Sequence, residues 1–196
     1  MNLLYCGGLP ERVAVFGVPV PVRWSYRDVM RLFEMAKDPG VPDAVKGALA
    51  VRMFFREDVF RLAAERGSTD PGEEITRAVV SFISGGREES AADAASAQPL
   101  FDFDFDAELI YGAFIQTYGI DLAEQELHWW KFRALLRSLP AETEFMRVLA
   151  VRSGDISSLP EGEERARLRR LRAKFALPAR GTAEERARLF GRAVKL

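Results

Sequence analysis

The sequence predicts a mainly α-helical protein, a multi-helix bundle of helical hairpins preceded by a short N-terminal β-hairpin. Apolar residues recur at helical spacing through most of the 196 residues, and capping residues precede several of these stretches. Alternating β-branched residues are confined to the N-terminal end. A hydrophobic content of 48% beside 29% charged residues is ordinary for a globular chain, so a sizeable core is expected.

The N-terminal strands are expected at residues 13–16 and 18–22, which are apolar and β-branched and meet at Gly17. Pro19 and Pro21 have no backbone N–H to donate, so the second strand can pair along one edge at most. We therefore expect a short, irregular hairpin and no larger sheet.

Helices follow from Ser25 onward. Ser25 is a good N-cap for an apolar stripe that includes Val29 and Leu32. Pro42 suits the first turn of a second helix, whose buried face is expected to comprise Val45, Ala48, Leu49 and Met53. Residues 54–60 leave open whether this helix continues or turns near residues 57–58.

A third helix has clearer boundaries, with Asp70 as N-cap, Pro71 after it and Gly85–Gly86 at its end. Residues 87–99 contain no large apolar side chain and cannot offset their ordering entropy by burial. The sequence thus predicts an N-terminal unit at residues 1–85, a flexible linker at residues 86–100 and a C-terminal helical unit at residues 101–196. An exposed, alanine-rich helix is the alternative for the linker.

The C-terminal unit opens with FDFDFD, which we expect to form an extended strip with one apolar and one acidic face. Asp106 then caps a helix that ends at Gly119, a left-handed C-cap position. Asp121 and Glu124 resemble a capping box for the next helix, which Pro140 stops. These two helices are expected to form an antiparallel hairpin with an aromatic seam.

Adjacent helical positions point about 100° apart, so Trp129 and Trp130 cannot share one stripe. Trp129 is assigned to the hairpin seam. Trp130, with Arg133 and Arg137 on its side, is a candidate partner-binding anchor, but the favoured interpretation is that it covers another helix of the same domain. For Phe101 and Phe103 the first alternative is docking on the helical core, and the second is binding to a partner.

The C-terminal end is basic: residues 161–196 carry eleven Lys or Arg against five Glu. The apolar residues Leu168, Leu171 and Phe175 form a narrow seam, and Thr182 with Glu185 caps a last helix. A solvated amphipathic face explains this composition best. A surface for an acidic protein partner comes second, and nucleic-acid binding comes last because exposed aromatic residues for base stacking are missing.

No residue pattern indicates catalysis, a cofactor or a metal site. His128 is the single histidine and Cys6 the single cysteine, so a zinc site and an activated thiol both lack partners. No phosphate-binding loop is present. The net charge of −1 favours neither nucleic acid nor membrane, and neither a bilayer-spanning run nor an export signal is seen. We expect a non-enzymatic, soluble, cytoplasmic protein.

Several motifs resemble one family: YGIDL, HWWKFRALLRSLP and FMRVLAVRS, supported by SYRDVMRLFEM, VSFISGG and RLRRLRAKFALP. They are similar to the bacteriophage gene-product-fifteen family, small proteins encoded beside the tape-measure gene. The resemblance spans residues 24–178 and implies a tail assembly chaperone in the bacterial host cytoplasm. It implies the tape-measure protein as partner, with the major tail tube protein as a second and a homo-oligomer left open. A structural adaptor retained in the virion is the alternative, and a nucleic-acid-binding protein is third.

Overall fold

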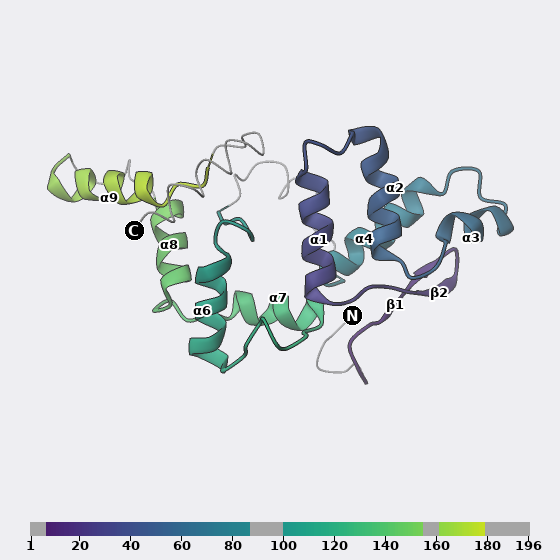
Figure 1. Cartoon of the computed structure of the whole chain (residues 1–196), viewed down its shortest axis with the longest axis horizontal. Helices are drawn as coiled ribbons and strands as arrows, with labels where there is room; N and C mark the ends of the chain where they lie inside the picture. Colours follow the sequence, from purple (N-terminus) through teal and green to yellow (C-terminus); the bar gives the residue numbers. More distant parts are fainter. Residues whose placement is uncertain (1–6, 87–99, 155–160, 179–196) are drawn as a thin grey trace. The chain divides into compact units, whose positions relative to one another are not determined.

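The computed structural model describes residues 7–86, 100–154 and 161–178 (Figure 1). Within these ranges the chain forms β1 (Arg12–Val15), β2 (Val18–Pro21), α1 (Tyr26–Lys37), α2 (Asp43–Phe54), α3 (Val59–Glu65), α4 (Gly72–Ile83), α6 (Ala107–Tyr118), α7 (Trp129–Arg137), α8 (Glu144–Ser153) and α9 (Glu163–Lys174). The mainly α-helical class with an N-terminal β-hairpin is confirmed.

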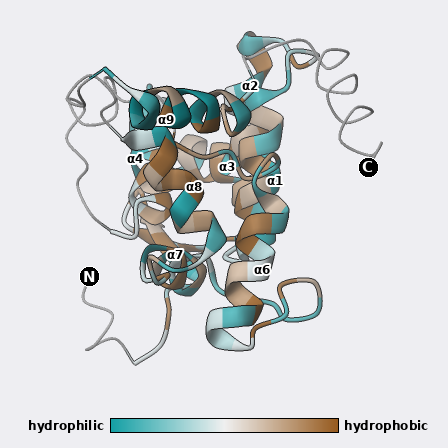
Figure 2. Cartoon of the chain, turned by 90° about the vertical axis from the view of Figure 1, so that its left-hand side faces the viewer, coloured by the Kyte–Doolittle hydropathy of each residue, from teal (hydrophilic) through white to brown (hydrophobic). Residues whose placement is uncertain are grey.

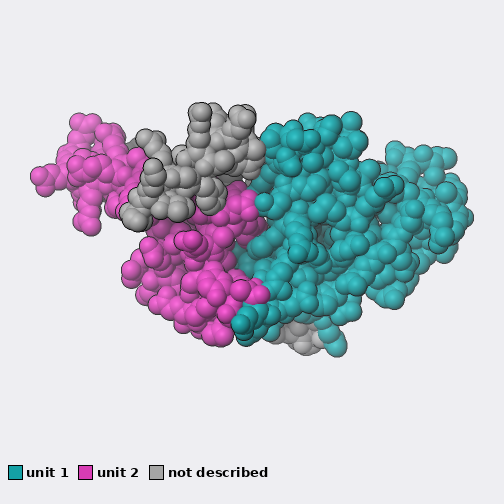
Figure 3. Space-filling view, in the orientation of Figure 1, with its two compact units in different colours: residues 1–97, 124–137 teal, residues 98–123, 138–196 magenta. Residues whose placement is uncertain are grey.

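These elements form two compact units (Figure 3). Unit 1 consists of the described residues of Met1–Ala97 together with Glu124–Arg137, and unit 2 consists of those of Gln98–Ala123 and Ser138–Leu196. This division differs from the expected one, because α7 packs with unit 1 although the sequence grouped it with residues 101–196. The predicted linker at residues 87–99 and the helix expected after Thr182 lie outside the described residues.

The β-hairpin is regular and packed. Val15 pairs with Val18 across a two-residue turn in which Phe16 and Gly17 have φ angles of +51° and +72°. Positive φ at both turn residues gives the twist that matches an antiparallel pair, and glycine adopts it without strain. Val15 and Val20 are buried, and β1 lies against α4, so the hairpin is part of the unit 1 core.

Arg23 holds the carboxyl end of α2. Its Nη1 donates to three carbonyl oxygens, those of Arg52 at 2.9 Å, Met53 at 3.2 Å and Phe55 at 2.6 Å. The last carbonyls of a helix lack intrahelical partners and carry the negative end of its dipole, so a guanidinium is favourable there.

The segment that follows α2 turns before a new helix begins. α2 ends at Phe54, and Asp58 caps α3 by accepting hydrogen bonds from the backbone N–H groups of Phe60 at 3.0 Å and Arg61 at 3.1 Å. The sequence left open whether the helix continues through residues 54–60 or turns near residues 57–58. The structure shows the turn.

The prediction that a helix begins at Asp121 is wrong. Asp121 forms a local turn, with its Oδ1 accepting from Ala123 N at 2.8 Å. The chain then pairs with the segment before α1: Tyr26 N donates to Leu127 O at 3.0 Å, and Trp129 N donates to Trp24 O at 2.8 Å. These tertiary hydrogen bonds replace helical ones, so α7 starts only at Trp129.

The expected hairpin of the helices before and after Gly119 is wrong for the same reason. α7 packs on α1 in unit 1, whereas α6 packs on α8 in unit 2. The end of α6 itself was predicted correctly, since Gly119 is left-handed with φ +63°.

In unit 2, α8 contacts both α6 and α9. Ile110 and Phe114 of α6 are buried, as are Phe145 and Val148 of α8. α9 contributes no buried residue and is coloured mainly hydrophilic in Figure 2, whereas α8 carries hydrophobic turns. The seam predicted for α9, comprising Leu168, Leu171 and Phe175, is half-buried.

Candidate protein-binding surfaces

The two adjacent tryptophans both bind the carboxyl end of α4. Trp129 Nε1 donates to Ile83 O at 2.9 Å, and Trp130 Nε1 donates to Phe82 O at 2.7 Å. The Trp129 ring also meets Phe33 of α1 edge-on at 5.8 Å. Trp130 is only 6% exposed, so it covers a helix of its own unit and does not project as an anchor.

His128 precedes α7 and is buried, with both ring nitrogens in use. Its Nδ1 accepts from Trp130 N at 3.1 Å, and Nε2 lies 3.0 Å from Pro10 O. Because a carbonyl only accepts, Nε2 carries the proton and Nδ1 is a bare acceptor in the neutral ring. Burial lowers the pKa of His128 from its ordinary value, against the opposing effect of Pro10 and Glu11. The ring stacks on Trp24 at 5.6 Å, so its role is structural.

The other residues predicted beside Trp130 differ in exposure. Arg133 is half-buried over the turn that ends α4, where a Cβ added to Gly85 would meet its Nη1. Gly85 also has φ +73°, which residues with a side chain rarely adopt, so a substitution there would strain the backbone even if the flexible Arg133 side chain moved aside. Arg137 is exposed on the last turn of α7.

Phe101 and Phe103 lie in unit 2, so the structure does not join them with Trp130, Arg133 and Arg137 into one patch within either unit. Both phenylalanines are half-buried. Their rings meet at 5.0 Å, and Phe101 packs edge-on against Phe145 of α8 at 5.7 Å. The expectation that these rings dock on the helical core is thus met for Phe101.

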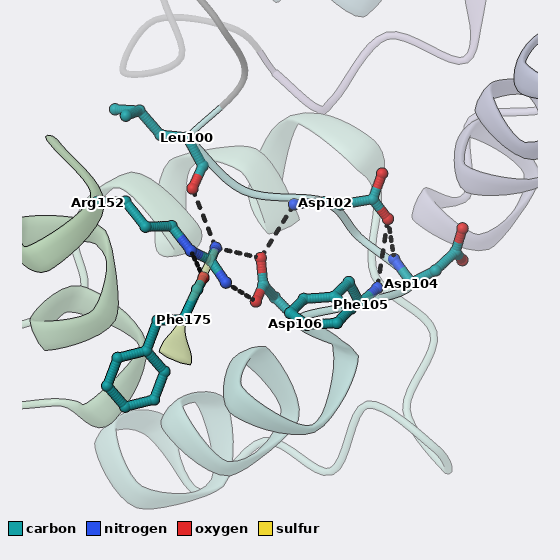
Figure 4. A network of polar contacts seen from close by, with 7 residues as sticks. All are labelled: Leu100, Asp102, Asp104, Phe105, Asp106, Arg152 and Phe175. Atoms are coloured by element: carbon teal, nitrogen blue, oxygen red, sulfur yellow. Dashed lines mark hydrogen bonds and ion pairs between the residues drawn. The ribbon is translucent and has the colours of Figure 1, made fainter. Parts of the chain in front are cut away.

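The extended strip expected for FDFDFD is wrong, because the segment coils into a turn. Asp102 Oδ1 accepts from Asp104 N at 2.9 Å and from Phe105 N at 3.2 Å (Figure 4). Asp102 O accepts from Asp106 N at 2.9 Å. Aspartate side chains readily form such turns with their own backbone, which the alternating pattern obscured.

Asp106 and Arg152 form a buried ion pair at the centre of this turn (Figure 4). Arg152 Nη1 and Nη2 donate to the two carboxylate oxygens of Asp106 at 2.7 Å and 2.8 Å. The guanidinium also donates to Leu100 O at 3.0 Å and Phe175 O at 2.7 Å. Asp106 is therefore at the N-cap position as predicted, but its carboxylate makes no capping hydrogen bond to α6.

The sequence interpretation missed Arg152, although a signal for it existed. Phe145, Val148 and Arg152 are spaced three and four residues apart, so the arginine falls on the buried stripe of α8. An arginine at such a position needs a buried acceptor, and residues 100–123 supply five acidic side chains without any Lys or Arg.

Of the α2 residues that were expected to be buried, Val45, Ala48 and Leu49 are exposed, and Met53 is half-buried. Val45 and Leu49 lie one turn apart on the outer face of α2. Near the end of α2, a pocket of about 230 Å³ is lined by Arg23, Val51, Arg52, Phe55, Arg56, Glu57, Asp58, Val59 and Phe60. Five of its nine lining residues are charged, and Phe60 adds an exposed apolar side chain to it.

Unit 2 also presents apolar side chains. Tyr111 and Ile115 lie one turn apart on α6 and are 37% and 43% exposed, and Leu100 and Phe105 are exposed before it. Residues 107–118 are apolar around most of the helix, which predicts burial on more than one side, and this prediction is wrong. Only the side of Ile110, Ala113 and Phe114 is buried.

The described residues contain no cluster of three or more His, Cys, Asp or Glu side chains suited to a metal ion. None of the helices in the described ranges combines the length and apolar composition that crossing a bilayer requires.

A family model described as "Bacteriophage Gp15 protein" matches residues 8–177. No curated protein and no solved structure gives a match. The matched range contains both the α7 tryptophans and the Asp106–Arg152 pair.

Proposed function

Because the chain belongs to the bacteriophage Gp15 protein family, we propose that it is a non-catalytic phage tail morphogenesis protein. In this proposal it is a tail assembly chaperone in the cytoplasm of the bacterial host. It binds the tape-measure protein and keeps that protein soluble. It dissociates when tail tube protein polymerises around the tape-measure protein. The family match is the observation that supports the proposal most.

The exposed apolar side chains fit this role. Val45, Leu49, Phe60 and Val80 in unit 1, and Leu100, Phe105, Tyr111 and Ile115 in unit 2, are large and accessible. Burial of apolar area at ~25 cal/mol per Å² would drive binding to apolar helices of a client. No chemical step is needed for such a protein, since the client is covered and then released.

Co-expression tests the proposal. Together with this protein, the tape-measure protein should shift from the insoluble to the soluble fraction and should co-purify with it. A variant with glutamine at both Val45 and Ile115 should give a smaller shift, because it removes apolar surface from each unit without disturbing a buried residue. No gain in solubility with the wild-type protein would refute the chaperone role.

Mass spectrometry of purified mature particles separates the chaperone from a structural adaptor. A chaperone should be absent from the particles, whereas an adaptor should be present at a fixed ratio to the tube protein. Binding of nucleic acid, steeply weakened by salt and lost when the arginines of α9 are neutralised, would instead favour the third function.

A further inference from the structure

One face of α6 combines exposed apolar residues with negative charge. Glu108, Tyr111 and Ile115 are spaced three and four residues apart and are all exposed. Gly112 lies beside them, and a Cβ placed on it would meet nothing within 4 Å. We call Glu108, Tyr111, Gly112 and Ile115, with Asp121 after the helix, the α6 face.

The α6 face is acidic at both ends. Glu108 lies in the first turn, and Asp121 follows the last turn, where its Oδ1 accepts from the Tyr111 hydroxyl at 3.1 Å. Among the described residues neither carboxylate forms an ion pair, and residues 100–123 include no Lys or Arg. The apolar residues of the face thus lie between Glu108 and Asp121 in the chain, and both of these side chains are acidic.

We propose that the α6 face binds an amphipathic helix of a protein partner that carries basic residues at both ends of an apolar stripe. The apolar residues of the partner cover Tyr111 and Ile115, and its Lys or Arg side chains pair with Glu108 and Asp121. The missing side chain at Gly112 lets the partner backbone approach closely. The identification of this partner as the tape-measure protein rests on the proposed function. The apolar and acidic character of the α6 face is independent of that proposal.

The two negative charges of the α6 face favour binding of a helix with basic ends over binding of other amphipathic helices. An acidic helix with the same apolar spacing would place like charges together at both ends, which costs binding energy. A second copy of this chain is a poorer occupant, because the apolar seam of its basic helix α9 is already half-buried in contact with α8.

Two synthetic helical peptides test the proposal. Both share one apolar stripe, and they differ only in carrying lysines or glutamates at its two ends. Titrated into the full-length protein and followed by fluorescence anisotropy, the lysine peptide should bind about tenfold more tightly than the glutamate peptide, a difference of about 1.4 kcal/mol. Equal affinities, or no binding of the lysine peptide, would overturn the proposal.

Matched variants locate the binding site. Ile115→Gln should weaken binding of the lysine peptide about tenfold, whereas Val80→Gln, which alters a 54% exposed side chain of α4, should not. Glu108→Lys should abolish the preference between the two peptides, because one end of the face is then basic and the other acidic, and Glu142→Lys, an equal change of charge at another exposed position in unit 2, should leave it unchanged. Equal effects within either pair would place the site elsewhere.

Two outcomes separate this inference from the proposed function. If Ile115→Gln and Glu108→Lys leave the solubility gain of the tape-measure protein intact, the α6 face is not its binding site although the chaperone role stands. If the wild-type protein gives no solubility gain but discriminates between the peptides as described, the chaperone role fails and the α6 face remains a helix-binding surface.

Discussion

At the scale of single residues, His128 shows how a buried polar side chain serves the fold. Its neutral ring accepts from Trp130 N and donates to Pro10 O, which connects the start of α7 to the segment before β1. A second proton would turn Nδ1 into a donor facing another donor. His128, for which the sequence offered no metal-binding partners, is therefore a structural hydrogen-bonding residue.

This geometry predicts a pH dependence of stability. Burial lowers the pKa of His128 in the folded protein, whereas in the unfolded chain the pKa of His128 is near 6.5. Just below pH 6.5, His128 therefore takes up a proton in the unfolded state but not in the folded state. The contribution of His128 is complete above pH 6.5 and declines as the pH falls below it. Thermal unfolding followed by tryptophan fluorescence should therefore show a lower Tm on acidification.

The control is His128→Asn, whose side chain can still accept from Trp130 N but does not titrate. Its Tm should start lower, because the bond to Pro10 is lost, and should change less between pH 7 and pH 5.5 than that of the wild type. Parallel curves for the two proteins would show that other groups cause the acid sensitivity.

At the scale of elements, caps and tertiary hydrogen bonds set the helix boundaries. Ser25 caps α1 by accepting from Arg27 N, and Asp58 caps α3 with two hydrogen bonds. Asp121, with equally good capping chemistry, caps nothing because the chain after it pairs with the segment before α1. A capping residue thus predicts a helix start only when the backbone that follows it is not hydrogen-bonded to a distant segment of the chain.

Removing the α3 cap should have a measurable cost. Asp58→Ala leaves the N–H groups of Phe60 and Arg61 without their acceptor and should lower the free energy of unfolding by about 1 kcal/mol in urea titrations. Asp43→Ala is the matched control at the first turn of α2, since Asp43 makes only a solvent-exposed pair with Lys46 and no capping bond. Comparable losses in the two variants would contradict the capping role.

At the scale of the whole molecule, the two units differ in how they are held together. All three tryptophans, Trp24, Trp129 and Trp130, belong to unit 1, where aromatic rings fill the core. Unit 2 has a buried ion pair, Asp106 with Arg152, that also fixes Leu100 O and Phe175 O. One charged network thereby connects α6, α8 and the end of α9.

Breaking that network should act on unit 2 alone. Asp106→Asn leaves a buried guanidinium without its counter-charge and should destabilise unit 2 by about 3 kcal/mol. Hydrogen exchange should accelerate in α6 and α8, while the tryptophan fluorescence transition of unit 1 should keep its midpoint. Glu142→Gln, which changes an exposed charge in the same unit, is the control and should alter neither signal. A shift of the fluorescence midpoint with Asp106→Asn would show that the units unfold together.

The sequence by itself determined the helical class, the hairpin turn at Gly17, the start of α1 and the end of α6, because caps, left-handed glycines and apolar spacing act over a few residues. Tertiary structure decided the partners. It placed α7 with α1, buried Trp130 beneath α4, joined Asp106 to Arg152 across 46 residues and left the outer faces of α2 and α6 exposed. The spacing of apolar residues shows that a helix has an apolar face. The neighbour that covers this face is decided by contacts between residues far apart in the chain.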